Sequence, residues 1–245
     1  MARIAWPPRR PCRPPIARRG RLRNMPLINA LRVFSVVIAG AGGFAQEIFE
    51  YVEGEARRGG ARVAGYIDDD PGKVLDGIAL PHLGTTWDFR PQDGQAVIVA
   101  IGSVDARREI IGRLTGRGVP VPTYLHGAAI VSDAAAIGPG SIVCPLAIIN
   151  RGATLGAGVL ANVHCSVGHG AGVGEYSVLS PGAILNGDAA VGARCFLGTR
   201  ATIYPGVRIG DDCVVDSHTG VSTGTGDRKF ITSGSQQITV RRIAG

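Results

Sequence analysis

Aliphatic residues recur at every sixth position through the second half of the chain. Starting at Ala128, the sequence divides into sixteen consecutive hexads without an insertion. Val, Ile or Leu fills the fourth place of fifteen hexads, with Ala161 as the exception, and the second place is always small. A period of six is typical of a β-solenoid, in which each hexad forms a short strand and a turn. We therefore expect a parallel β-helix over residues 126–225.

The first half of the chain follows a different pattern. Short apolar runs that predict strands are followed by amphipathic stretches that predict helices. The expected elements are strands over Val33–Ala39, 61–70 and 96–102 and helices over Phe44–Arg58 and Ala106–Arg117. Strands that alternate with helices indicate a small parallel sheet. We expect a Rossmann-like α/β domain over residues 33–124, separated from the β-helix by a proline-containing boundary.

The positive charge of the chain is concentrated near its start. The formal net charge is +7, but nine arginines lie in residues 1–32 and the first acidic residue is Glu47. Subtracting those nine leaves −2, so we expect no nucleic-acid partner for the folded body. Residues 1–30 lack the apolar run of a signal peptide or membrane span. They are interpreted as an over-extended start or a disordered basic tail, and residues 226–245 as a C-terminal tail.

The five cysteines show neither C-x-x-C spacing nor a disulfide framework. Cys165, Cys195 and Cys213 fall at the small second place of their hexads, and Cys144 falls at a fifth place. These positions favour small core or turn residues over metal ligands or nucleophiles. We expect no metal site and a cytoplasmic protein with reduced thiols.

Both halves of the chain resemble one known family over roughly residues 33–222. The hexads look like the left-handed parallel β-helix of hexapeptide-repeat acyltransferases. The segments "VVIAGAGGFAQEI", "GYIDDD" and "VAIGSVDARREIIGRL" resemble the sugar O- and N-acetyltransferases that include sialic acid O-acetyltransferases and bacillosamine-pathway N-acetyltransferases. The resemblance implies an acetyl-CoA-dependent acyltransferase that acts on a nucleotide-activated sugar or sialic acid in surface-glycan synthesis. It also implies a homotrimer with active sites between subunits.

The stretch "GAGGFA" joins the first expected strand to the first expected helix. Its glycines allow a tight turn, and the amides at the start of the helix form an anion site. With Asp68 ending the next strand, the spacing imitates a dinucleotide fingerprint, but about ninety residues hold only half of a doubly wound fold, which disfavours an NAD-dependent enzyme. The resemblance implies that the nucleotide of a sugar nucleotide lies near Gly42, Gly43 and Phe44. Asp68 or Asp69 would lie close by, and a purely structural glycine turn is the alternative.

The resemblance also identifies a catalytic histidine. In the family this histidine follows an asparagine after six intervening residues, just beyond an aliphatic position, and Asn162, Val167 and His169 match that arrangement. An imidazole ordinarily titrates at pH ~6.5, so it takes up a proton near neutral pH and suits general-base catalysis. His169 would remove the acceptor's proton as its oxygen or nitrogen attacks the thioester carbonyl of acetyl-CoA.

The next residue departs from the family, because Gly170 stands where relatives carry the acid that orients the imidazole. Three explanations stay open: the base works without an acid, the acid comes from elsewhere, or activity has been lost. Three hexads make one coil, so Asp188, eighteen residues on, would stack on Gly170 at about the 4.8 Å strand spacing. We therefore expect Asp188 to replace the missing acid. The alternative function is a catalytically silent sugar-nucleotide-binding or scaffolding homologue.

Two further histidines lie within the hexads. His164 and His218 lack a partner at a recognisable spacing, so they are interpreted as turn or surface residues. Hexads also occur in γ-class carbonic anhydrases, but His164 and His218 would lie three coils apart in one chain, which disfavours a zinc site. Val178 replaces a histidine that contacts the CoA thioester region in some relatives, and the chain end lacks the family's Gly-x-Pro-Ala ending.

Overall fold

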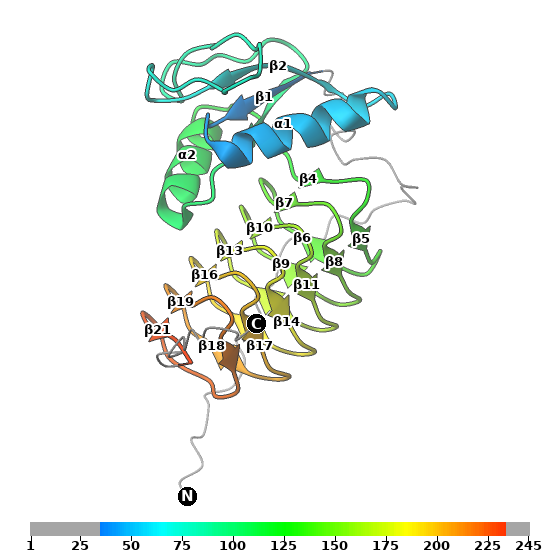
Figure 1. Cartoon of the computed structure of the whole chain (residues 1–245), viewed down its shortest axis with the longest axis vertical. Helices are drawn as coiled ribbons and strands as arrows, with labels where there is room; N and C mark the ends of the chain where they lie inside the picture. Colours follow the sequence, from blue (N-terminus) through cyan, green and yellow to red (C-terminus); the bar gives the residue numbers. More distant parts are fainter. Residues whose placement is uncertain (1–34, 234–245) are drawn as a thin grey trace, which may run out of the picture.

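A computed structural model describes residues 35–233, which form a small α/β domain followed by a three-sided solenoid (Figure 1). The expected fold class, a Rossmann-like domain followed by a left-handed parallel β-helix, is confirmed. The basic tail expected in residues 1–30 and the last part of the C-terminal tail lie outside the described residues.

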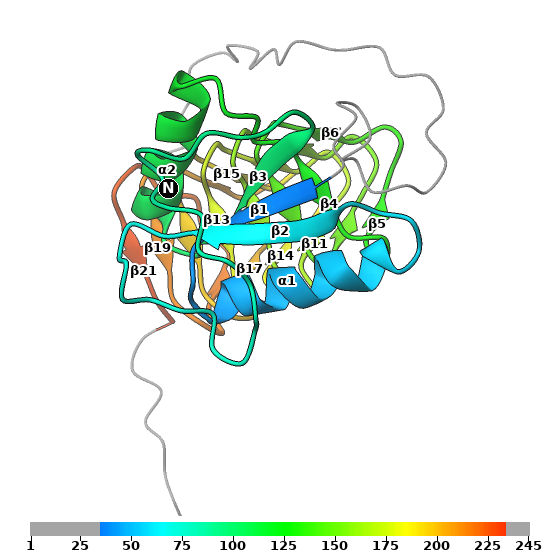
Figure 2. The same ribbon diagram turned by 90° about the horizontal axis from the view of Figure 1, so that it is seen from above.

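The amino-terminal domain is a three-stranded parallel sheet covered by one helix on each face (Figure 2). Its elements are β1 (Ser35–Ala39), α1 (Gly43–Ala56), β2 (Arg62–Ile67), β3 (Gln95–Val99) and α2 (Val104–Gly116). The strand order is β2-β1-β3. Alternate residues of β1 point to opposite faces: Val36 shares a buried cluster with Ile48 of α1, and Val37 shares another with Leu114 of α2. The central strand therefore anchors both helices.

The sixteen hexads form sixteen of the eighteen solenoid strands. Each of the sixteen hexads contributes a two-residue strand from its third and fourth places. The solenoid strands are β4 (Tyr124–Leu125), β5 (Ile130–Val131), β6 (Ala136–Ile137), β7 (Ile142–Val143), β8 (Ile148–Ile149), β9 (Thr154–Leu155), β10 (Leu160–Ala161), β11 (Ser166–Val167), β12 (Gly172–Val173), β13 (Val178–Leu179), β14 (Ile184–Leu185), β15 (Ala190–Val191), β16 (Phe196–Leu197), β17 (Thr202–Ile203), β18 (Arg208–Ile209), β19 (Val214–Val215), β20 (Gly220–Val221) and β21 (Phe230–Ile231). The fourth-place side chains point inward and form one continuous buried cluster.

Every third strand pairs in parallel, which gives the solenoid three faces. The β4 sheet has the order β21-β19-β16-β13-β10-β7-β4, the β5 sheet β20-β17-β14-β11-β8-β5, and the β6 sheet β18-β15-β12-β9-β6. Pairing extends one strand ahead of the first hexad, because β4 pairs with β7. In the last coil Val214 pairs with Phe230, so that coil is two residues shorter than the others.

The corners between these sheets are turned by left-handed residues. All fourteen first places from Gly140 to His218 have a φ between 55° and 72°, although eight of them are not glycine. His164 and His218 are two of these corner residues, and both are exposed, as expected of turn histidines. Residues eighteen apart along a corner therefore have the same backbone conformation.

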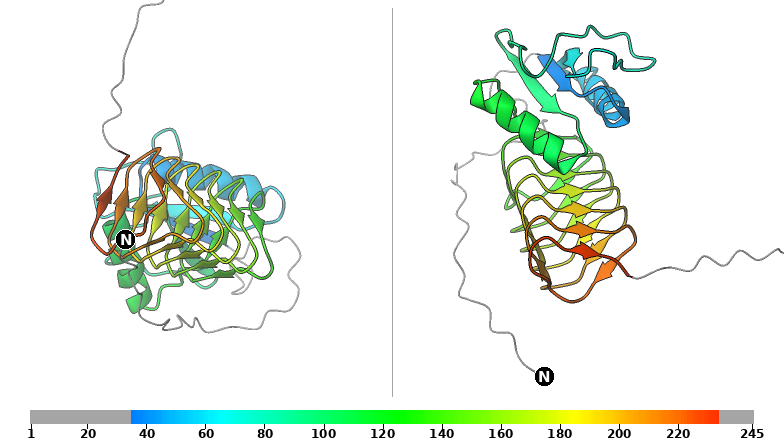
Figure 3. Two further views of the ribbon diagram at one scale, coloured as in Figure 1. Left: turned by 90° about the horizontal axis from the view of Figure 1, so that it is seen from below. Right: turned by 90° about the vertical axis from the view of Figure 1, so that its left-hand side faces the viewer.

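The amino-terminal domain packs on the first coils of the β4 sheet (Figure 3). Outward residues of that sheet, Ile142, Leu160 and Val178, share a buried cluster with α1. Arg107 of α2 is fully buried, and its guanidinium donates to the carbonyls of Val99, Gly140 (2.8 Å) and Gly158 (2.7 Å). On the α1 side, Glu55 accepts hydrogen bonds from the Tyr124 hydroxyl (3.1 Å) and the Gly127 amide (2.5 Å). Hydrogen bonds from Arg107 and to Glu55 thus hold the domain in place on either side of its apolar contact with the β4 sheet.

Candidate active site

The carboxyl edge of the amino-terminal sheet is open and rich in glycine. The Gly42–Gly43 turn follows β1, Asp68 follows β2, and Ser103 caps the start of α2 after the loop that follows β3. Gly42 and Gly43 are exposed, a Cβ built on either meets no atom within 4 Å, and no side chain caps α1. Because α1 and α2 lie on opposite faces, this edge has the topology at which open α/β sheets bind ligands. Ser103, which lies at the same edge, carries no motif that sequence reasoning recognised.

The two predicted aspartates differ in how many hydrogen bonds and ion pairs their carboxylates already make. The Asp68 carboxylate accepts one hydrogen bond, from the Asp70 amide (2.9 Å). Asp69 accepts from the amide and hydroxyl of Thr86 (both 2.7 Å) and pairs with Arg113 (2.7 Å). Burial by itself would raise the pKa of Asp69, but the hydrogen bonds from Thr86 and Arg113 outweigh it and lower that pKa. Asp68 is therefore the more available carboxylate at this edge of the sheet, whereas Asp69 ties the loop after β2 to α2.

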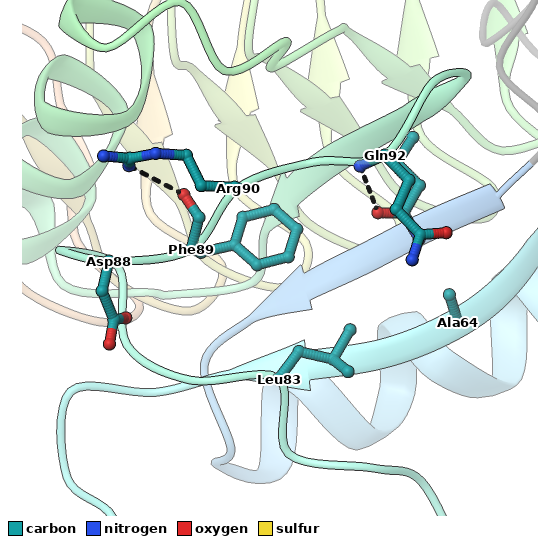
Figure 4. Close-up of a pocket in the computed structure, with 7 residues that line it drawn as sticks. Ala64, Leu83, Asp88, Phe89, Arg90 and Gln92 are labelled. Carbon is teal, nitrogen blue, oxygen red and sulfur yellow. Dashed lines mark hydrogen bonds between the residues drawn. The ribbon is translucent and has the colours of Figure 1, made fainter.

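A pocket of about 450 Å³ lies beside β2 and the segment that connects it to β3 (Figure 4). Its lining includes Ala64 within β2, Gln95 at the amino end of β3, and Phe89 and Arg90 from the connecting segment. The Gln92 amide donates to the Gln95 side chain across one end (2.9 Å). None of the predicted site residues lines this pocket, so it is not part of the candidate site.

His169 lies at the corner between β11 and β12 and is exposed. Its imidazole lies against the backbone of Gly187 in the next coil. A Cβ built on Gly187 would lie 2.5 Å from Nε2 and 3.1 Å from Nδ1 of the ring. Only glycine leaves room for the imidazole in this position. Gly187 was missed from the sequence, where its only signal is that it stands eighteen residues after the histidine.

Asn162 lies at the preceding corner, between β10 and β11. Its Oδ1 accepts a hydrogen bond from the Val163 amide (2.7 Å), which closes a local turn. Strand β11, with Val167 pointing inward, separates Asn162 from His169 within one chain. The structure therefore places these two predicted residues on opposite edges of the β5 sheet.

Asp188 and Gly170 do stack on one corner, as the eighteen-residue spacing predicts. The Asp188 amide donates to the carbonyl of His169 (2.9 Å). A Cβ built on Gly170 would overlap Asp188 Oδ1 and lie 3.4 Å from its Cγ. The carboxylate of Asp188 therefore occupies the space that a side chain at position 170 would need.

Family models match both parts of the chain. Residues 35–114 match the model of the PglD N-terminal domain, and residues 189–217 match the model of the hexapeptide repeat of succinyl-transferase. No curated protein gives a significant match.

Solved structures that include acetyltransferases match most of the chain. The acetyltransferase domain of PglB from Neisseria gonorrhoeae, in complex with acetyl coenzyme A, is 25% identical with a TM-score of 0.75, covering 82% of this chain and 97% of that one. WeeI from Acinetobacter baumannii is 26% identical with a TM-score of 0.70, covering 78% and 93%. PerB from Caulobacter crescentus, in complex with CoA and GDP-perosamine, is 29% identical with a TM-score of 0.60, covering 79% and 91%. The expected resemblance to the hexapeptide-repeat sugar acetyltransferases is confirmed. The expected enzyme class, an acyltransferase, is confirmed.

The cysteines of this acetyltransferase are unsuited to nucleophilic catalysis. Cys144, Cys165, Cys195 and Cys213 are free thiols and buried. Burial raises the pKa of Cys165 and of Cys195 to about 12, so both stay protonated at neutral pH. Within residues 35–233 no three His, Cys, Asp or Glu side chains group as metal ligands. In the same residues, no helix combines the length and apolar character needed to span a membrane.

Proposed function

We propose that the enzyme transfers an acetyl group from acetyl-CoA to a nucleotide-activated sugar or sialic acid in surface-glycan synthesis, with His169 as the general base. The observation that carries this proposal is the exposed imidazole of His169, seated on Gly187 at a solenoid corner. Relatives add support for the substrates, because the PglB domain holds acetyl coenzyme A and PerB holds CoA and GDP-perosamine. The four free thiols fit a reducing cytoplasm.

The reaction needs one proton acceptor and no cofactor beyond the acyl donor. The imidazole of His169 takes the proton from the acceptor's amino or hydroxyl group as that nitrogen or oxygen attacks the thioester carbonyl. The resulting tetrahedral intermediate collapses, the carbon–sulfur bond breaks, and the CoA sulfur takes up a proton as it leaves. Such a base typically contributes ~10²–10⁴-fold to the rate, and the rest comes from holding the two substrates together.

We place the acceptor's nucleotide at the carboxyl edge of the amino-terminal sheet. The exposed Gly42–Gly43 turn and the uncapped start of α1 offer backbone amides to phosphate oxygens. Phe44 lies beside this turn and packs partly into the α1 cluster, and Asp68 supplies an acceptor for a ribose or base donor. Asp69 then acts by holding the adjacent loop.

A homotrimer with active sites between subunits is also part of the proposal. The β5 sheet carries exposed apolar side chains, with Ile130 64% and Ile184 36% exposed, and Leu146 at its edge is 52% exposed. Asn162 and His169 stand on the two edges of this sheet. Packing of copies along it would bury these side chains and bring one copy's Asn162 toward another's His169.

The decisive test is turnover of acetyl-CoA with a panel of nucleotide amino-sugars and sialic acids, followed as free thiol and product mass. We expect His169→Ala to lower kcat by ~10²–10⁴-fold, with little change in the KM for either substrate. Retained binding is expected, because a variant of the Caulobacter enzyme with one histidine replaced by asparagine also holds CoA and GDP-perosamine. Full activity of His169→Ala would overturn the catalytic assignment.

The second candidate function is a silent sugar-nucleotide-binding homologue. It is favoured by Gly170, since relatives carry an acid at that place. Calorimetry separates the two functions: an acetyltransferase binds both CoA and the sugar nucleotide, whereas a silent binder gives heat only with the sugar nucleotide. Thiol release with any acceptor excludes the silent homologue.

A further inference from the structure

Two glycines on neighbouring coils each make room for a titratable side chain of the other coil. Gly187 leaves space for the imidazole of His169, which projects toward it from the coil before. Gly170 leaves space for the carboxylate of Asp188, which projects back from the coil after. Because 169 and 170 are adjacent, as are 187 and 188, the two side chains lie over neighbouring positions of one corner, between the same two coils.

The backbone has nearly the same conformation at the two stacked positions, 170 and 188. Gly170 and Asp188 both adopt left-handed conformations, with φ of 66° and 58°. The hydrogen bond from the Asp188 amide to the His169 carbonyl fixes the register of the two coils. The carboxylate of Asp188 therefore lies over Gly170, the residue that follows His169, without any change of the main chain.

The Asp188 carboxylate has no competing assignment in residues 35–233. It is exposed, and the ion pairs formed there involve other aspartates and glutamates. Asp211 and Asp212 on another corner show the contrast, because Arg194 pairs with both. Arg151, one coil before His169, is the stacked basic residue, and it offers its carbonyl to the Gly170 amide (3.1 Å).

We infer that Asp188 is the positioning residue for His169. The two groups are not paired within 4.0 Å in this structure, so the exposed carboxylate, supplied from the following coil, has to turn toward the ring. There it accepts from one ring nitrogen, fixes the tautomer and orientation of the imidazole, and stabilises the imidazolium formed when the base takes its proton. This inference rests on the proposed function, since it deepens the role of the same histidine. A neighbour that sets the tautomer acts through the base and does not touch the substrate.

The first experiment compares Asp188→Asn with Asp133→Asn. Asparagine tolerates the left-handed conformation, so the fold is kept. Asp133 is exposed at the same corner three coils earlier and serves as the control. We expect Asp188→Asn to lower kcat by about 10–100-fold, as loss of an orienting partner typically does, while both KM values stay within about twofold. Asp188→Glu should recover part of the loss, and an unchanged kcat in Asp188→Asn would overturn the inference.

A transplant tests the reciprocal glycines directly. Asp188→Gly removes the carboxylate, and adding Gly170→Asp returns one from the coil of His169 itself. We expect the double variant to exceed Asp188→Gly in kcat by about tenfold, within the range of an orienting partner. Gly170→Asp alone places two carboxylates in one space and should lower activity. Equal kcat values for the double variant and Asp188→Gly would contradict the inference.

Nitrogen chemical shifts of the imidazole give a readout that does not depend on turnover. In protein with labelled histidine, Asp188→Asn should shift one ring nitrogen of His169, and Asp133→Asn should leave both unchanged. Unmoved signals in Asp188→Asn would overturn the inference. If His169→Ala keeps full activity, the proposed catalytic role fails, whereas an inactive His169→Ala with a fully active Asp188→Asn defeats the positioning role alone.

Discussion

The imidazole of His169 lies on the backbone of Gly187, eighteen residues on and one coil away, at a place where a side chain would collide with the ring. A glycine eighteen residues after the histidine therefore sets where the proposed base lies. The colliding atoms belong to the far end of a side chain, so a larger residue at 187 would move the ring and spare the main chain.

Gly187→Ala should therefore impair catalysis without unfolding the solenoid. We expect kcat to fall by about 10–100-fold, because small displacements of a catalytic group cost that much, and the free energy of unfolding to change by less than about 1 kcal/mol. Steady-state kinetics and urea denaturation measure the two effects. Gly112→Ala is the control, since a Cβ there meets open space on α2. Normal kcat in Gly187→Ala would show that the ring position is unimportant.

Arg107→Lys should weaken the packing of the amino-terminal domain on the solenoid. Burial lowers the pKa of Arg107 to about 10, so the guanidinium is still charged at pH 7, and it reaches three carbonyls that a single ammonium cannot serve together. Each buried carbonyl left without a hydrogen-bond donor lowers the free energy of unfolding by about 1–3 kcal/mol. We expect at least about 1 kcal/mol of destabilisation by urea denaturation, and almost none for Arg108→Lys on the exposed side of α2. Equal stability of the two variants would contradict this prediction.

Sixteen of the eighteen solenoid strands could be predicted, because each of them depends on its own hexad. An inward aliphatic residue at a fixed place is a local signal, and it survives even at the exception, Ala161, which is fully buried. The packing of the amino-terminal domain was not predicted, although its signal was present. The outward third places of the β4 sheet, Ile142, Leu160 and Val178, are all large and apolar, and that pattern appears only when every third hexad is compared.

The candidate site was harder to predict from the sequence than the fold, because its geometry depends on contacts between residues of different coils. Asn162 and His169 belong to one local motif, yet a strand of the solenoid runs between them. Gly187 has no chemistry of its own and matters only through the side chain stacked on it. The stacking of Asp188 on Gly170 could be predicted from the sequence, because residues eighteen apart lie above one another on neighbouring coils.

Asp69 should make the amino-terminal domain sensitive to acid. Its pKa is lowered in the folded protein, so its contribution to stability is present above the ordinary value of 3.8 and is lost as the pH falls below that value. We expect the loss of stability between pH 5 and pH 3 to be smaller in Asp69→Asn than in the wild type. Urea midpoints at a series of pH values measure this difference. Asp76→Asn, at an exposed position with no ion pair in residues 35–233, is the control. Identical pH dependence in all three proteins would argue against the role of Asp69.

Mixing two inactive variants should restore activity if the site lies between subunits. In a trimer that combines Asn162→Ala with His169→Ala, some interfaces pair an intact His169 from one copy with an intact Asn162 from another. Random assortment of equal amounts gives such interfaces at about one quarter of the sites of a cyclic trimer. We therefore expect the co-expressed mixture to recover about a quarter of wild-type kcat per site, while each variant alone stays at least tenfold below that level. A mixture no more active than the separate variants would place both side chains in one chain's site or remove Asn162 from it, and an active Asn162→Ala would exclude a catalytic role for that residue.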